Sequence, residues 1–198
     1  VDEEYISSAA LDDLECAWGC TQGFLKGGDS ASIPVLCVFD SEEVGSVSPQ
    51  GAGSSLLEDT LGRICDGLKL NRGRMLAQSF LVSADNAHAI HPDHPEYADR
   101  GNCPRMNGGV VIKFNANQRY ATDGRSCAVF RAACAEAGAP VQLMANRSDL
   151  PGGSTLGSIA GTLVPVSTVD IGLAQLAMHS CFETAGAADT ACMVQALQ

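Results

Sequence analysis

Short apolar runs that alternate with longer helical patterns constrain the fold of this chain more than any other feature. Five runs are rich in β-branched residues and bounded by turn residues, which predicts strands at 33–39, 80–82, 110–114, 141–144 and 165–169. Helical patterns cover 11–25, 55–68, 124–137 and 183–197, and residues 152–154 open a further short helix. This alternation predicts an α/β fold with a mostly parallel or mixed central sheet flanked by helices.

Composition narrows the class of protein. A chain of 198 residues with 45% hydrophobic and 18% charged residues can bury the core of one globular domain. The longest apolar runs fall well short of the roughly 20 residues that span a bilayer, so we expect no membrane segment. A net charge of −11 makes nucleic acid an unfavourable partner, because phosphates require a basic surface.

The nine cysteines indicate a reducing compartment. Their number is odd and several lie in apolar or helical contexts, which is typical of buried thiols in a cytoplasmic protein. Cys16 and Cys20 are spaced so that both could reach one metal ion from a helix. Since no second Cys or His pair matches them, we expect both to serve packing.

Acidic side chains follow several of the predicted strands. Glu42 and Glu43 come after the first strand, Asp85 after the second and Asp170 after the fifth, with His179 further along. Ligands of parallel α/β sheets bind beyond the carboxyl ends of the strands, so these groups should meet at one edge. Clustered carboxylates repel one another unless cations separate them. Together with imidazoles they suit zinc, manganese or cobalt, and two such ions can polarise a carbonyl.

Each of these residues also has a simpler interpretation. Glu42 and Glu43 could form a solvated acidic loop, although neighbours in extended structure point in different directions and could divide two roles. His88, His91 and His94 recur every three residues, but intervening prolines exclude a helix that would align them, so they could be plain loop residues. A histidine such as His179, after an apolar run, is also compatible with a core position.

Four co-linear segments resemble the aspartyl aminopeptidase and vacuolar aminopeptidase I family of zinc metallopeptidases. They are 39–46 with 50–52, 83–92, 111–122 and 176–180, and a weaker fifth segment is 153–157. Their order and spacing agree with the family over nearly the whole chain. The sequence therefore resembles this family, and the resemblance implies a three-layer zinc-peptidase-like sandwich fold.

The resemblance assigns roles to the acidic residues and His179. It implies that Asp12 bridges two metal ions, that Glu43 and His179 bind one of them, and that Asp85 binds the other. Glu42 matches the general base. The implied cofactors are two divalent ions, zinc in the first place, with manganese or cobalt as alternatives.

The same resemblance implies the substrate side of the site. His88 and Lys113 match residues near the substrate, and the regions of Gly153 and Met178 match walls of the specificity pocket. The implied activity is removal of the N-terminal residue, Asp or Glu in some members, from peptides with a free N-terminus by a metal-bound hydroxide, with Glu42 as base. The family's homo-oligomeric assembly is implied as well.

The chain departs from the family pattern in what it lacks. It has neither a His-Thr-Asp-Ser-Pro-like motif nor the inserted β domain, and it begins with Val1 rather than Met. We therefore expect residues 1–198 to be the C-terminal portion of the catalytic domain, incomplete relative to the family. A complementing chain could supply the missing histidine. The alternatives are a truncated, inactive fragment and a non-catalytic assembly or metal-binding module.

Overall fold

A mixed four-stranded sheet forms the centre of the computed structural model, which describes residues 3–28, 30–150 and 152–198. Its strands are β2 (Phe80–Ala84), β6 (Ser167–Gly172), β4 (Val110–Phe114) and β5 (Val141–Ala145), in that order. The β2–β6 and β4–β5 pairs are parallel, whereas β4 and β6 are antiparallel. The predicted sheet is thus confirmed in its mixed form.

A second sheet of very short strands continues the first. Its order is β1 (Tyr5–Ser8), β8 (Glu183–Gly186), β7 (Ala174–Leu176) and β3 (Ala87–His88). Asp85 and Asn86 join β2 to β3, and Leu173 joins β6 to β7, so two adjacent strands cross from one sheet into the other. The acidic loop that contains Asp85 lies at this crossing.

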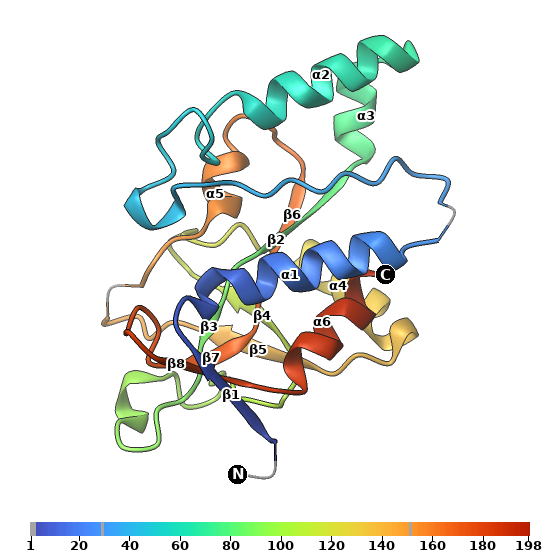
Figure 1. Cartoon of the computed structure of the whole chain (residues 1–198). Coiled ribbons are helices and arrows are strands. Elements are labelled where there is room, and N and C mark those ends of the chain that lie inside the picture. The colour runs from blue at the N-terminus through green and yellow to red at the C-terminus, as the bar shows by residue number, and fades with distance from the viewer. Residues whose placement is uncertain (1–2, 29, 151) are drawn as a thin grey trace.

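The helices form two groups (Figure 1). Helix α1 (Leu11–Lys26) packs along α6 (Asp189–Leu197), and α4 (Gly124–Ala137) contacts α6. The first pair approaches closely, since a side chain at Gly19 would lie 2.8 Å from Met193 Sδ. The other group comprises α2 (Leu56–Leu68), α3 (Arg72–Gln78) and α5 (Leu156–Ala160). The main core lies between β4, β6 and the first group, and includes Val110, Ile112, Val169, Ile171, Phe130 and Met193.

Most of the predicted elements are confirmed, and two expectations are wrong. Residues 183–197 do not form one helix, because 183–186 pair with β1 and β7 as β8 and the helix begins at Asp189. Residues 33–39 do not form a buried strand. They are extended, but within the described residues they find no strand to pair with, and Pro34 lacks an N–H. Val35 and Val38 are 43% and 60% exposed.

All nine cysteines are free, in agreement with the reduced thiols expected from the sequence. Cys16 is fully buried and its thiol donates to Asn86 Oδ1 at 2.7 Å, so it packs against the loop between β2 and β3. No helix among the described residues has the length and apolarity needed to cross a membrane.

Candidate metal centre

Three acidic segments and one histidine meet where the two sheets join. Asp12 lies at the start of α1, and Glu42 and Glu43 begin the short 3-10 helix η1 (Glu42–Val44). Asp85 follows β2, and His179 lies in the turn after β7, where it adopts a left-handed backbone (φ 68°). Asp85 follows a strand of the main sheet, as the edge argument predicts, whereas Glu42 and Glu43 follow the unpaired residues 33–39. The expectation for Asp170 is wrong, because it lies inside β6 and accepts hydrogen bonds from Thr155 and the Ala121 N–H instead.

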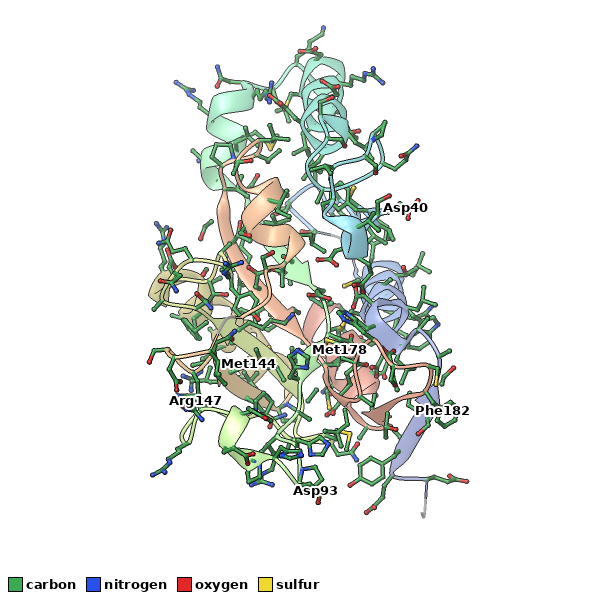
Figure 2. The ribbon with its side chains drawn as sticks, turned by 90° about the vertical axis from the view of Figure 1, so that its left-hand side faces the viewer. Asp40, Asp93, Met144, Arg147, Met178 and Phe182 are labelled. Atoms are coloured by element: carbon green, nitrogen blue, oxygen red, sulfur yellow. The ribbon has the colours of Figure 1, made fainter. Side chains whose placement is uncertain are left out.

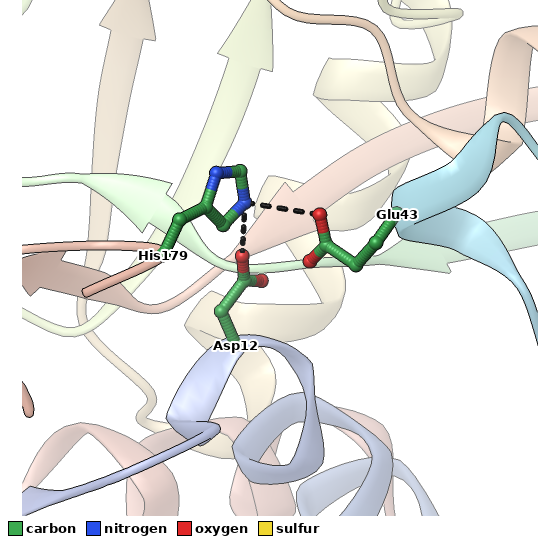
Figure 3. Close-up of side chains that lie close together, drawn as sticks. All are labelled: Asp12, Glu43 and His179. Carbon is green, nitrogen blue, oxygen red and sulfur yellow. Dashed lines mark ion pairs between the residues drawn. The ribbon is translucent and has the colours of Figure 1, made fainter. Parts of the chain in front are cut away.

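Asp12, Glu43 and His179 converge on one point (Figure 3). His179 Nε2 lies 3.0 Å from Asp12 Oδ2 and 3.1 Å from Glu43 Oε2. One ligand atom from each of the three lies within 4.8 Å of the others. An imidazole and two carboxylates form a donor set that divalent zinc accepts.

A second group of carboxylates shares Asp12 with the first. Asp12, Asp13 and Asp85 each place one oxygen within 4.8 Å of the others. The Oδ1 atoms of Asp12 and Asp13 are buried and have no hydrogen-bond partner. Buried acceptors without partners are costly, and a cation between them would satisfy both. The residues present therefore fit two neighbouring divalent ions that share Asp12.

Electrostatics support the same conclusion. Burial, followed by the charges of Asp85 and Glu43, raises the pKa of Asp12 to about 7. Burial and the charge of Asp85 raise the pKa of Asp13 to about 8. Both carboxyl groups have pKa values far above their usual range because His179 beside Asp12 and Lys113 beside Asp13 offset burial and the neighbouring carboxylates only in part. A divalent ion would reverse this effect.

Lys113 supplies a positive charge beneath Asp85. Its Nζ donates to Asp85 Oδ2 at 3.1 Å and to the Asn86 carbonyl at 2.7 Å, and its side chain is 2% exposed. Burial alone would lower the Lys113 pKa, but Asp85, Tyr120 and Asp170 raise it above its usual value. Its ammonium is therefore engaged in orienting the Asp85 loop, and direct contact between Lys113 and the substrate stays a prediction.

A cleft of about 540 Å³ opens beside the carboxylates and contains the remaining predicted site residues. His88, Gly153 and Met178 all line it, together with Met144. Figure 2 shows Met144 and Met178 near the middle of the molecule. Desolvation, then the charges of Lys113 and His179, lowers the pKa of His88, so its ring is neutral at pH 7. A neutral imidazole can donate to or accept from a bound peptide.

Glu42 lies beside this cleft, next to the convergence point. Burial, then the charges of Asp85 and Glu43, raises the pKa of Glu42 above its usual value. A carboxylate with a raised pKa is a stronger base, which is the property that proton transfer near neutral pH requires.

Sequence reasoning missed two residues of the centre. Asp13 adjoins Asp12 and was given no role. Glu183 is 2% exposed and joins two ligand segments: its Oε2 accepts from the Asp12 N–H at 2.9 Å and its Oε1 from the His179 N–H at 2.6 Å. The signal for Glu183 was an acidic residue within a short strand, but the segment was interpreted as helix.

Comparison with known sequences identifies the family. The model of the family described as aminopeptidase I zinc metalloprotease (M18) matches residues 1–198. A probable M18 family aminopeptidase 2 of Clostridium novyi is 44% identical over 192 residues, which cover 96% of this chain and 44% of the relative. That of Mycobacterium bovis is 48% identical over 200 residues, which cover 98% of this chain and 46% of the relative. The chain thus spans about half the length of these curated relatives.

Solved structures share the fold. An M18 aminopeptidase of Thermotoga maritima has a TM-score of 0.89 at 25% identity, covering 100% of this chain and 46% of that one. A cryo-EM structure of an Ape4 and Nbr1 complex contains a chain with a TM-score of 0.91 at 37% identity. That match covers 98% of this chain and 38% of the other.

Proposed function

Because the chain belongs to the aminopeptidase I zinc metalloprotease (M18) family, we propose that it carries the metal centre of an aminopeptidase. The observation that supports this most directly is the pair of donor groups that share Asp12. Asp12 would bridge two divalent ions, Glu43 and His179 would hold one, and Asp85 would hold the other with Asp13 alongside. Such ions polarise a peptide carbonyl and make water more acidic.

Glu42 acts as the general base of this proposal. It accepts a proton from the attacking water and then delivers it to the leaving amine, so one carboxyl group serves both steps. Its raised pKa favours the first transfer. Glu43, one residue later, points to His179 instead, so the two neighbours divide base and ligand between them.

The substrate is a peptide with a free N-terminus. Its first side chain would enter the cleft at Gly153 and Met178, where Gly153 leaves open space for it. His88, neutral at pH 7, would hydrogen-bond the peptide. Because Lys113 is already engaged by Asp85, a preference for N-terminal Asp or Glu would have to come from other groups.

Residues 1–198 form part of the catalytic domain in this proposal, and the complete enzyme is a homo-oligomer. The alternative is an inactive fragment or a non-catalytic metal-binding module. Turnover distinguishes the proposed enzyme from the module, because a non-catalytic module would bind metal without turnover even when the remainder of the family's chain is present.

Metal binding and turnover test the proposal directly. Zinc titrated into chelator-treated protein should bind in the micromolar range or tighter, and mass spectrometry should count the ions. Aminopeptidase turnover on Asp-, Glu- and Leu-terminal chromogenic substrates should appear with zinc and disappear with chelator. Protein that binds no zinc at millimolar zinc concentration would contradict the proposal. Zinc binding without turnover, even when the remainder of the family's chain is present, would favour the non-catalytic metal-binding module.

Glu183 should control metal affinity although it binds no ion itself. Gln at this position places an amide N–H against a backbone N–H, so one of the two ligand segments is released. We expect Glu183→Gln to weaken zinc binding about 10- to 100-fold, as loss of a residue that orients ligands does. A competitive chelator titration measures this. Glu136→Gln, an exposed site on α4, is the matched control, and equal affinities for both variants would contradict the prediction.

A further inference from the structure

A buried carboxylate on the central sheet lies behind the residues that line the substrate cleft. Asp170 lies within β6 and is 1% exposed, and the proposed mechanism does not use it. It does not line the cleft, but two segments that do line it are bonded to its side chain. A carboxylate is costly to bury unless its oxygens have hydrogen-bond donors, so the donors that Asp170 has found indicate what it does.

The first of these segments is the glycine-rich loop that leads into α5. Asp170 Oδ1 accepts from the Thr155 hydroxyl at 2.8 Å, and both side chains are buried. Thr155 is the N-cap of α5, where a hydroxyl usually accepts from a backbone N–H of its own helix. Its side chain forms no such bond. The hydroxyl is directed to β6 instead, and this bond fixes the cleft-lining loop 152–155 to the sheet.

The second segment is the loop after β4 that contains Tyr120. Asp170 Oδ2 accepts from the Ala121 N–H, and the Asp170 N–H donates to the Thr122 hydroxyl at 2.8 Å. Tyr120, the residue before Ala121, lines the cleft and is 5% exposed. Its ring centroid lies 5.5 Å from Lys113 Nζ. Asp170 thus fixes the backbone that carries the Tyr120 ring.

Close packing surrounds the bond between Asp170 and the glycine-rich loop. Helix α5 lies beside β2 and β6 (Figure 1), and a side chain on Gly157 would collide with Asp170 Oδ1. A side chain on Gly152 would collide with the Asn146 amide. Gly153, between these two contacts, faces open space. The loop is therefore fixed at both ends, by Asn146 at one and by Asp170 at the other, and is free only where the substrate would enter.

From these contacts we infer that Asp170 is a positioning residue that sets the shape of the pocket for the first side chain of the substrate. It holds two walls of the cleft, the loop 152–155 and Tyr120, in fixed places on β6 without touching the substrate itself. The inference rests on the proposed function and concerns the fit of the first side chain, not the chemistry at the metal ions. Loss of these bonds should therefore raise KM and leave kcat and metal content nearly unchanged.

Thr155→Val removes one of the bonds and keeps the shape of the side chain. In the zinc-loaded assembly, KM for a Leu-terminal substrate should rise about 10- to 100-fold, as loss of a hydrogen bond to a charged group predicts. An Ala-terminal substrate should be affected much less, because its methyl group offers little surface to the pocket. Thr155→Ser restores the hydroxyl and should bring KM to within about twofold of the original value. An equal rise for both substrates, or no recovery with Ser, would overturn the inference.

Asp170→Ala removes the acceptor and completes a double-mutant cycle. In that background Thr155→Val should add little to KM, because the bond is already absent. Fully additive effects would show that Thr155 acts without Asp170 and would overturn the inference. If Asp170→Ala does not fold, the comparison of Val with Ser at position 155 decides alone. Thr168→Val is the matched control, because Thr168 is also buried on β6 and its hydroxyl donates to the nearby Val166 carbonyl at 3.0 Å. It should leave KM unchanged for both substrates.

Amide hydrogen exchange on the metal-free chain tests the positioning separately from turnover. Exchange should accelerate about tenfold or more at 152–157 in Thr155→Val, and at both 152–157 and 120–122 in Asp170→Ala. Unchanged exchange at 152–157 in both variants would overturn the inference even if the enzyme is active. Absence of turnover in the unaltered protein would contradict the proposed function instead, and the exchange result would still decide whether Asp170 holds the two segments.

Discussion

Replacing Glu42 by Gln should lower kcat by about 10²- to 10⁴-fold while the protein retains its metal, because the change removes a proton acceptor and not a ligand. The amide keeps the shape of the side chain but cannot take a proton from water. The measurement combines kcat of the zinc-loaded assembly with its metal content. KM should change much less than kcat, since substrate binding does not require the base.

Glu43→Gln is the matched control for this prediction. Glu43 lies 3.1 Å from His179 Nε2, so its loss should lower zinc content as well as turnover, and excess zinc should restore part of the rate. If Glu42→Gln instead loses metal, or keeps more than a tenth of the rate, Glu42 is not the base. The two variants together distinguish the function of Glu42 from that of Glu43.

Asp12→Asn should strengthen the metal-free fold and weaken metal binding at the same time. The Asp12 carboxyl ionises near pH 3.8 when unfolded and only near 7 in the fold, so its charge destabilises the fold increasingly between these values. At pH 8 the free energy of unfolding without metal should rise by about 1 to 3 kcal/mol. The gain should become small near pH 4, where the folded state is protonated and the unfolded state is about half protonated. Zinc affinity should fall about 100-fold or more, because a shared ligand is lost.

Denaturant unfolding at several pH values with chelator present measures the first effect, and zinc titration measures the second. Asp93→Asn removes the same charge from an exposed loop and should change neither quantity. A stability gain that persists unchanged at pH 4 would show that ionisation of Asp12 is not its cause. A variant with unchanged zinc affinity would remove Asp12 from the centre.

The sequence predicted the elements whose local pattern and packing agree. The run 110–114 forms β4 because it pairs on both sides, and 124–137 forms α4 behind the cap of Asp123. Residues 33–39 have an equally strong strand pattern, but among the described residues no strand lies beside them to pair with. A local pattern cannot show whether such a partner strand is present. The strands of the second sheet have two to four residues, too few for a periodicity to emerge.

The site could be predicted in part for similar reasons. The end-of-strand argument placed Glu42, Glu43 and Asp85 at one edge, and the structure brings them together although residues 33–39 form no strand. The same argument failed for Asp170, which lies inside β6. Asp12 follows no strand of the main sheet, and only the family resemblance indicated it. Glu183 accepts from backbone N–H groups of two other segments, so its place in a short strand was the signal for it, and no spacing between residues indicated its role.

The two hydrogen bonds that Glu183 accepts have a consequence for how the protein is synthesised. They join residues 12 and 179, which are separated by 167 positions (179 − 12), so the two halves of the centre cannot meet until Glu183 has been translated. An ion held there acts as a reversible cross-link over that loop and removes conformational freedom mainly from the unfolded chain. Zinc capture would then mark chains that extend past Glu183, and chains that stop before His179 would remain without this protection against proteolysis.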